Sequence, residues 1–260
     1  MSFTGRRVVV TGAGTGIGAA TAGLFLAAGA EVIAVQNRAP APHASSRVTM
    51  DLSNPDSIAA ACDALPPRFD ILCNIAGTGA DGNTPEDIIA VNFIGTRLFT
   101  ETLLGRIAPT GCIVNTASVA ARYWRRDIER VRALMALPGF GEIAAFWAAA
   151  GLDHQQSYHI SKAAVVALTM KQANANVRTG PRFNVVSPGF TDTPMLQRAF
   201  AVANETVKAL AQSNNSINAP EGVAKVVLFL CSDDARVING ADIAADAGLL
   251  ATINCGEFAL

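Results

Sequence analysis

The chain has 260 residues, 50% of them hydrophobic, and its formal net charge at pH 7 is -1. This length and composition predict one large α/β domain or two small ones with a sizeable core. A nearly neutral chain has no electrostatic attraction for nucleic acid or for an anionic membrane surface, so we expect neither partner. No uninterrupted apolar run reaches about 18 residues and no signal-peptide pattern is seen, which predicts a cytoplasmic protein.

The five cysteines form neither a C-x-x-C pair nor a cluster with histidine at zinc-binding spacing. An odd number without such patterns indicates reduced thiols of an intracellular protein. His154 and His159 lie close together in the sequence, but they have no third candidate ligand nearby, so we expect no metal site. The cysteines are Cys62, Cys73, Cys112, Cys231 and Cys255.

The first motif is a β-branched run, residues 7–11, followed by a glycine-rich segment, residues 12–20, and an apolar helical stretch. This order is the context in which the pyrophosphate of a dinucleotide binds. Glycines let the backbone approach the phosphates, and the helix N-terminus offers free N–H groups. The alternative is a plain tight turn between strand and helix, and we favour phosphate binding.

The second predicted strand, residues 31–36, ends at Gln36 and is followed by Asn37 and Arg38. In NAD-binding units an acidic residue at this place holds the ribose hydroxyls. Gln36 removes the repulsion toward a 2′-phosphate, and Arg38 could pair with one. The segment therefore favours NADP(H), with a solvated loop arginine as the alternative reading of Arg38.

Strand and helix patterns alternate along the rest of the chain, with no repeat, low-complexity tract or linker between two domains. This alternation predicts an α/β fold with a doubly wound parallel sheet, in a single domain over residues 1–260. Further strands are expected at residues 47–50, 70–74, 112–117, 182–187 and 241–245, and helices at residues 54–65, at residues 220–231 and from Thr84-Pro85 onward.

Tyr158 and Lys162 lie four residues apart, so on a helix they share one face. The apolar residues 163–170 predict that this helix is buried. A phenol has an unperturbed pKa of about 10, which is too high for acid/base work near neutral pH, but neighbouring cations favour the phenolate. The pair is a candidate general acid/base beside a redox cofactor. A half-exposed helix face with the same spacing by chance is the alternative.

Several motifs occur in a fixed order. They are Thr11-Gly12-x-x-x-Gly16-Ile17-Gly18, Asn74-x-Ala76-Gly77, Asn92, Ser118, Tyr158-x-x-x-Lys162 and Pro188-Gly189. Over essentially the whole chain, this ordered set resembles the short-chain dehydrogenase/reductase family. The resemblance implies a Rossmann-type sheet and an NAD(P)-dependent oxidoreductase that acts on CH–OH groups.

The resemblance also implies catalytic roles. Tyr158 would protonate a carbonyl oxygen or deprotonate an alcohol as hydride passes to or from nicotinamide, and Lys162 would lower the tyrosine pKa and bond the nicotinamide ribose. Ser118 would polarise the substrate oxygen, and Asn92 would hold a water that links Lys162 to solvent. Taken alone, Ser118 reads as a turn residue at a strand end and Asn92 as a helix residue capping a neighbour.

The cofactor contacts implied by the resemblance run along the same motifs. They are Gly12, Thr15, Gly16, Ile17 and Gly18 at the pyrophosphate, Gln36 and Arg38 near the adenosine 2′ position, Asp51 and Leu52 beside adenine, Asn74, Ala76 and Gly77 along the adenosine ribose, and Tyr158, Lys162, Pro188, Gly189, Thr191 and Thr193 at the nicotinamide end.

One departure from the family pattern is an insertion at about residues 122–152, which leaves 39 residues between Ser118 and Tyr158. It has a charged, helix-prone part, a break at residues 138–139 and a second helix, residues 142–150. An insertion here resembles the branch of bacterial 3α-hydroxysteroid dehydrogenase/carbonyl reductase and coniferyl-alcohol dehydrogenase. It could cover the active site, replace a dimer interface, or both. Trp124, Phe146 and Trp147 could line an apolar pocket or belong to the core.

Residues 190–218 are expected to cover the substrate. The apolar members are Phe190, Met195, Leu196, Phe200 and Val202, and the polar part that we expect to be mobile holds Asn204, Gln212, Ser213, Asn214 and Asn215.

The expected function is an NAD(P)-dependent oxidoreductase, leaning to NADP(H), that interconverts a secondary alcohol and a ketone, or an aryl alcohol and an aldehyde. The expected substrate is a small, bulky, apolar or ring-shaped molecule such as a hydroxysteroid-like carbonyl compound. The alternatives are a 3-oxoacyl thioester reductase and a non-catalytic dinucleotide-binding regulator. The resemblance implies a homodimer or homotetramer.

Overall fold

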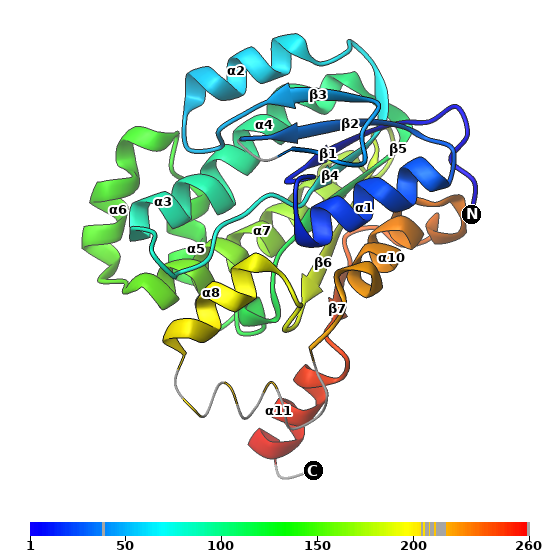
Figure 1. Ribbon diagram of the computed structural model, residues 1–260. Coiled ribbons are helices and arrows are strands. Elements are labelled where there is room, and N and C mark those ends of the chain that lie inside the picture. The colour runs from blue at the N-terminus through cyan, green and yellow to red at the C-terminus, as the bar shows by residue number, and fades with distance from the viewer. Residues whose placement is uncertain (38–39, 204, 206–207, 209–210, 212–216, 259–260) are drawn as a thin grey trace.

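The computed structural model describes residues 1–37, 40–203, 205, 208, 211 and 217–258. In this part of the chain seven parallel strands form one sheet in the order β3-β2-β1-β4-β5-β6-β7 (Figure 1). The doubly wound parallel sheet predicted from the sequence is confirmed. The strands are β1 (Arg7–Thr11), β2 (Glu31–Gln36), β3 (Ser46–Thr49), β4 (Phe69–Asn74), β5 (Ile107–Thr116), β6 (Arg182–Pro188) and β7 (Asp242–Ala245).

Helices cover both faces of the sheet (Figure 1). α1 (Gly16–Ala27) and α10 (Pro220–Cys231) pack together on one face, while α2 (Pro55–Ala64), α4 (Thr96–Leu103) and α7 (His154–Asn176) pack on the other. In β1 the side chains of Val8 and Val10 pack on the face covered by α1 and α10, and that of Val9 packs on the face covered by α2, α4 and α7. This strand is buried on both faces, which is why its sequence is continuously apolar.

Helix starts follow local capping chemistry. The Asn54 side chain accepts hydrogen bonds from two backbone N–H groups at the start of α2. Thr84 and Asp87 form a capping box at the start of α3 (Pro85–Ile89), and Asp153 and Gln156 form another at the start of α7. Because α7 carries Tyr158, the second box fixes where the helix that holds this side chain begins.

The helix that starts at Pro85 continues through a π-helical turn, Ala90–Gly95, into α4 and a short 3₁₀ turn, Leu104–Arg106. Among the described residues, the run Pro85–Arg106 is long and apolar enough to cross a membrane, but 61% of its most apolar window is buried. It packs against α2 and α7. The apolar residues of this helix are therefore accounted for by the protein core.

Residues 122–152 contain turns followed by α5 (Ile128–Met135) and α6 (Ile143–Ala150). The first helix begins later than the helix-prone sequence indicates. The guanidinium groups of Arg122 and Arg126 each lie 4.3 Å from the centre of the Tyr123 ring, and this stacking accompanies the turns. Val131 and Leu134 are fully buried in the cluster that α5 and α6 share with α7, so these helices extend the core.

Two further elements differ from the expectation. β5 begins at Ile107 rather than near residue 112, because Ile107 pairs with Phe69 before the register shifts. α11 (Leu249–Phe258) has no predicted counterpart and forms the end of the described chain (Figure 1). In residues 190–218, α8 (Pro194–Val202) is described, and an isolated bridge joins Thr191 to Asn218.

Candidate active site

The candidate site lies at the carboxyl ends of the strands, beside the point where the strand order reverses. β1 pairs with β2 on one side and with β4 on the other. In open parallel sheets the loops diverge at such a point and leave a crevice for a ligand. The glycine-rich turn follows β1, and the segment with Ala76 and Gly77 follows β4, so both predicted cofactor segments leave the sheet at the point where the rule expects the crevice.

The glycine-rich turn needs its glycines. Gly12 and Gly16 have φ values of +70° and +52°, in the left-handed region. A Cβ on Gly12 would lie 2.8 Å from Ala76 Cα, and a Cβ on Gly16 would lie 2.7 Å from Thr193 Cγ2. Thr15 is the N-cap of α1 and makes no side-chain capping bond, so its side chain leaves the first N–H groups of α1 available to a ligand. The first turn of α1 also holds Ile17 and Gly18.

Thr11, at the end of β1, fixes the loop that follows β4. Its buried Oγ1 accepts hydrogen bonds from the backbone N–H groups of Ile75 and Ala76, each at 3.0 Å. Thr11 is part of the glycine-rich motif, but it is not among the cofactor contacts that the sequence predicts. Its contribution is to hold the two loops of the crevice together.

The amide of Asn74 lies in the core. Its Nδ2 donates to Thr100 Oγ1 and to Asn115 Oδ1, both at 2.8 Å, and Asn115 Nδ2 donates to Thr169 Oγ1 at 2.8 Å. This network connects β4, α4, β5 and α7. The side chain of Asn74 therefore braces the strands, whereas Gly77 approaches the crevice, since a Cβ there would lie 3.1 Å from the Nζ of Lys162.

The end of β2 has an unsatisfied acceptor. Gln36 Oε1 is buried and has no hydrogen-bond partner among the described residues. Next to it, Asn37 Nδ2 donates to Asp51 Oδ2 at 3.1 Å, and Leu52 is buried. Arg38 lies outside the described residues. A buried acceptor at this place, together with the glycine turn, fits the ribose and pyrophosphate of a dinucleotide.

Tyr158 and Lys162 share one face of α7, as their spacing predicts. The Nζ of Lys162 lies 5.9 Å from the centre of the Tyr158 ring and donates to the backbone carbonyl of Thr116 at 3.1 Å. Ser118, just after β5, is close enough to the Tyr158 phenol to lower its pKa, and its Oγ accepts from the Ala120 N–H at 3.2 Å. The fold thus brings the hydroxyl of Ser118, which is distant in sequence, to the phenol and the ammonium that share one face of α7.

Burial dominates the proton equilibria of this group. It raises the pKa of the Tyr158 phenol; the hydrogen bond from Ser118 acts in the opposite direction, and the carboxylate of Asp81 raises the pKa further. Burial lowers the pKa of Lys162 from 10.5 to about 8, and this residue is only 5% exposed. In this environment the phenol stays protonated at neutral pH, whereas the pKa of the lysine lies close to neutral pH.

The side chain of Asn92 is fully engaged. It lies in the π-helical turn, where its Oδ1 accepts from the Thr78 N–H at 2.8 Å and its Nδ2 donates to the Thr78 carbonyl at 3.0 Å and to Ser161 Oγ at 3.3 Å. Ser161 Oγ in turn donates to the backbone carbonyl of Tyr158 at 2.8 Å. The amide therefore ties the loop after β4 to the helix that carries the phenol.

The segment after β6 closes the other side of the crevice. β6 ends at Pro188, and the hydroxyl of Thr191 donates to the Gly189 carbonyl at 3.1 Å. Thr193 Oγ1 donates to the Thr191 carbonyl at 3.2 Å and accepts from the Leu196 N–H at 3.3 Å, which caps α8. This chain of bonds holds the residues expected at the nicotinamide end in one compact turn.

Of the aromatic side chains predicted to line a pocket or join the core, Trp124 lines a small pocket with Tyr123 and His159, whereas Phe146 and Trp147 pack on the core. Phe146 is buried, and Trp147 Nε1 donates to the Leu152 carbonyl at 2.6 Å. In the substrate-covering segment the rings of Phe190 and Phe200 lie 5.7 Å apart, which gives α8 an aromatic contact with the loop before it. Its polar residues Asn204, Gln212, Ser213, Asn214 and Asn215 lie outside the described residues.

Asp81 is a site residue that the sequence-based prediction missed. Its side chain is 8% exposed, and its Oδ2 accepts from Arg198 Nε of α8 at 3.1 Å. Its charge acts on the phenol of Tyr158. The only signal in the sequence is its place between Gly79 and Gly82, in a turn shortly after the fourth strand.

In the described part of the chain no three His, Cys, Asp or Glu side chains form a group that could hold a metal ion. His154 and His159 both lie on α7. His154 is the first residue of this helix, and His159 directly follows Tyr158. All five cysteines are free, and Cys255 alone among them is exposed.

Comparison with known proteins agrees with this geometry. Residues 6–127 match the family model described as short chain dehydrogenase, and residues 128–250 match the model described as enoyl-(acyl carrier protein) reductase. A coniferyl-alcohol dehydrogenase of Pseudomonas sp. is 34% identical, over 97% of this chain and 99% of its own length. A 3-oxoacyl-[acyl-carrier-protein] reductase of Thermotoga maritima is 29% identical, over 96% of this chain and 100% of its own.

The fold is also similar to that of a solved dehydrogenase structure. The 3-alpha-hydroxysteroid dehydrogenase from Pseudomonas sp. B-0831, complexed with NADH, superposes with a TM-score of 0.81 at 27% identity, over 95% of this chain and 98% of that one. Family models that together span residues 6–250, and relatives that match along nearly their whole length, show that this chain belongs to the short-chain dehydrogenase/reductase family of NAD(P)-dependent oxidoreductases acting on CH–OH groups.

Proposed function

We propose that the protein interconverts a secondary alcohol and a ketone, or an aryl alcohol and an aldehyde, with Tyr158 as the general acid/base. One observation carries the proposal. A protonated phenol, close enough to Ser118 for that residue to act on its pKa, lies beside the buried Lys162 at the carboxyl edge of a parallel sheet. Such a phenol can donate a proton to a carbonyl oxygen, or take one from an alcohol once its pKa is lowered.

A bound nicotinamide cofactor supplies or accepts the hydride. The chain's own residues handle the proton and the charge. Tyr158 Oη holds the proton that goes to the substrate oxygen, and the hydroxyl of Ser118 orients that oxygen beside it. Lys162, with a pKa of about 8, is charged for most of the time at neutral pH and favours the phenolate that remains. A positively charged oxidised ring would act in the same direction.

Asn92 has a positioning role in this proposal. Its amide already uses its oxygen and nitrogen on Thr78 and Ser161, so it holds Lys162 and Gly77 in place through the loop and the helix that it connects. A relay water beside Lys162 would then be held by backbone groups of the π-helical turn, where the hydrogen-bond register of the helix is altered.

The cofactor proposal is NADP(H) in preference to NAD(H). Gln36 puts an unpaired amide oxygen, rather than a carboxylate, at the end of β2. A neutral side chain does not repel a 2′-phosphate, and Arg38 follows two residues later. The hydroxysteroid dehydrogenase relative was solved with NADH, so the preference rests on these residues alone.

The proposed substrate is bulky and ring-shaped. α8 brings Met195, Leu196 and Phe200 to the segment beside the crevice, with Phe200 against Phe190. Two of the compared relatives carry names of ring-containing alcohols, coniferyl alcohol and a 3α-hydroxysteroid. A second candidate is a 3-oxoacyl thioester, supported by the acyl-carrier-protein reductases among the matches. A non-catalytic regulator is disfavoured because Ser118, Tyr158 and Lys162 are all present.

We further propose a single catalytic domain that acts as a homodimer or homotetramer in the cytoplasm. The support for the assembly is the family membership, since short-chain dehydrogenases are commonly oligomeric. Helices α5 and α6, which share a core with α7, belong to the folded unit rather than to a separate lid. Sedimentation at several concentrations would give the subunit number.

The test is reduction of a mixed panel of steroid ketones, cyclic diketones, aryl aldehydes and a 3-oxoacyl thioester, followed by loss of reduced-nicotinamide absorbance. NADH and NADPH are used in parallel, and the Tyr158→Phe variant is the blank. Turnover that disappears in the blank supports the reaction class. Cofactor binding without turnover of any substrate would favour the regulator, and thioester turnover alone would favour the second candidate.

A further inference from the structure

The loop between β4 and α3 presents one acidic side chain to the substrate side of the crevice. Asn83 Nδ2 donates to the backbone carbonyls of Gly79 and Asp81, both at 3.0 Å, and closes the loop into a compact turn. The base of the loop is held by the two hydrogen bonds between Thr78 and Asn92. Asp81 therefore projects from a braced turn, and its carboxylate is 8% exposed.

The two carboxylate oxygens of Asp81 differ. Oδ2 accepts from Arg198 Nε at 3.1 Å, whereas Oδ1 is buried and has no hydrogen-bond partner among the described residues. An arginine can satisfy both oxygens of a carboxylate in a bidentate pair, but Arg198 approaches through Nε to one of them. A buried charged acceptor without a donor is costly, so this oxygen marks a place for a donor group.

The neighbours of Asp81 include α8 and the phenol of Tyr158. A Cβ built on Gly79 would contact Oδ1 directly and would lie 3.5 Å from Met195 Cγ, so Asp81 and Met195 meet over this glycine. The charge of Asp81 also acts on the Tyr158 phenol. Asp81 is thus tied to α8 through Arg198, and its charge reaches the phenol of Tyr158. The flexible thioether of Met195 near Gly79 can move aside to admit a ligand.

We propose that Asp81 is a specificity-determining residue whose Oδ1 accepts a hydrogen bond from a hydroxyl group of the substrate, remote from the reacting carbon. This inference rests on the proposed function and narrows its substrate class to hydroxylated ring alcohols and carbonyl compounds. Arg198 offsets the charge of Asp81, so a neutral hydroxyl suits the site better than an ammonium group. A carboxylate on the substrate would be repelled.

The experiment uses matched pairs that differ in one hydroxyl group. Suitable pairs are 4-hydroxybenzaldehyde with benzaldehyde, 4-hydroxycyclohexanone with cyclohexanone, and 17β-hydroxyandrostan-3-one with androstan-3-one. For the full-length protein we expect at least one pair in which kcat/KM of the hydroxylated member is about 100-fold higher, since a site built for a hydroxyl rejects the analogue without it. In Asp81→Ala this ratio falls to within a few-fold, through loss on the hydroxylated member.

Two further variants separate specificity from structure. Asp81→Asn keeps an acceptor oxygen and retains most of the discrimination. Arg198→Met breaks the ion pair but keeps the carboxylate, and it also retains the discrimination. The proposal is overturned when no pair shows a ratio above a few-fold in the unaltered protein, when Asp81→Ala keeps the ratio, or when Arg198→Met loses it as fully as Asp81→Ala.

Calorimetric binding of the same pairs, in the presence of the oxidised cofactor, distinguishes the two levels of failure. If no carbonyl compound is turned over but the hydroxylated member binds more tightly in an Asp81-dependent way, the proposed reaction fails and the specificity site stands. If turnover is normal and neither binding nor kcat/KM depends on the hydroxyl group, the reaction stands and the specificity site fails.

Discussion

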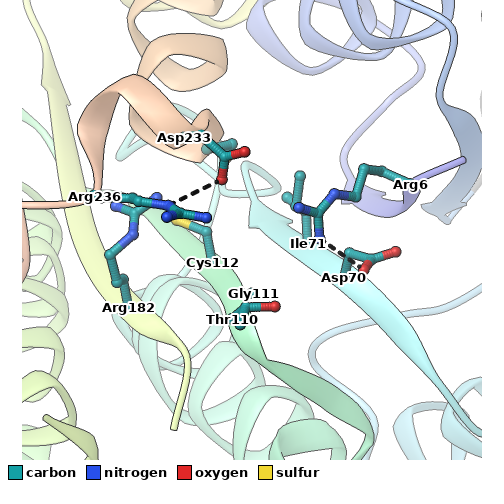
Figure 2. Close-up of a pocket in the computed structure, with 10 residues that line it drawn as sticks. Arg6, Asp70, Ile71, Thr110, Gly111, Cys112, Arg182, Asp233 and Arg236 are labelled. Carbon is teal, nitrogen blue, oxygen red and sulfur yellow. Dashed lines mark hydrogen bonds and ion pairs between the residues drawn. The ribbon is translucent and has the colours of Figure 1, made fainter. Parts of the chain in front are cut away.

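The two ends of the parallel sheet contain similar kinds of side chains and use them in opposite ways. Figure 2 shows the amino end, where Arg6, Asp70, Arg182, Asp233 and Arg236 line a pocket. Arg6 pairs with Asp70 at 3.1 Å and Arg236 with Asp233 at 3.4 Å. Arg182 donates to the backbone carbonyls of residues 230, 232 and 238. Each of these charges has a partner.

At the carboxyl end of the sheet several buried polar atoms have no partner in the protein. Buried atoms without a hydrogen-bond partner among the described residues include Gln36 Oε1, Asp81 Oδ1 and Thr116 Oγ1. Lys162 is buried, its ammonium donates to the Thr116 carbonyl and forms no ion pair with a carboxylate in the described part of the chain, and burial lowers its pKa to about 8. Polar groups that are unpaired in the protein are available to a cofactor and a substrate. The comparison teaches that buried polar atoms left without a hydrogen-bond partner, rather than the presence of a pocket, distinguish the carboxyl end of the sheet.

The largest expected effect comes from the phenol. Tyr158→Phe removes the proton donor and should reduce kcat by about 10²–10⁴-fold, the usual contribution of general acid/base catalysis. Affinity for the cofactor, measured by fluorescence titration, should stay within a few-fold. Tyr123→Phe, on the turns before α5, is the matched control and should keep full activity. Unchanged turnover in Tyr158→Phe would remove this residue from the catalytic step.

Replacing Lys162 should increase the stability of the fold and decrease turnover. Its pKa is lower in the folded state than in the unfolded chain, so below pH 8 the folded protein holds a buried charge at a cost that disappears by about pH 10.5. The free energy of unfolding therefore rises with pH between about pH 8 and pH 10.5, as Lys162 loses its proton in the folded state. Lys162→Met should increase the free energy of unfolding at pH 7 by up to about 3 kcal/mol while reducing turnover.

Urea unfolding at pH 7 and pH 10 measures this gain. The difference between Lys162→Met and the unaltered protein should shrink at the higher pH, because the unaltered lysine is then mostly neutral in the folded state. Lys171→Met, with the same change on a more exposed turn of α7, is the control. A variant that is less stable than the unaltered protein at pH 7 would show that the ammonium is well solvated.

The adenosine end should respond more moderately. Gln36→Asp adds a carboxylate where a 2′-phosphate would lie, so the ratio of kcat/KM with NADPH to that with NADH should fall about tenfold, equivalent to about 1.4 kcal/mol. Gln36→Asn adds no charge and should change the ratio much less. An unchanged ratio in Gln36→Asp would place the end of β2 away from the adenosine ribose.

The smallest effect is expected at the amino end. Arg236→Ala breaks an ion pair whose two side chains are 72% and 69% exposed, and such pairs contribute about 0–1 kcal/mol. Turnover and cofactor preference should not change. A loss of activity comparable to that of the carboxyl-end variants would contradict the contrast between the two ends.

Much of the fold follows from the sequence because its signals are local. The apolar runs of β1, β2 and β6 and the cap at Asn54 predict elements that the structure reproduces within about a residue. Errors occur where a distant partner decides. Ile107 extends β5 only because Phe69 lies opposite, and the turns around Tyr123 replace helix where two guanidinium groups stack on its ring.

By itself, the sequence determines the order of the elements, the turn that only Gly12 and Gly16 allow, and the spacing that puts Tyr158 and Lys162 on one helix face, since each depends on neighbours along the chain. Tertiary structure decides what those groups can do. Packing buries Lys162 and lowers its pKa, engages the amide of Asn92, and brings Asp81 beside α8. Desolvation and hydrogen-bond satisfaction depend on residues that are far apart in the chain.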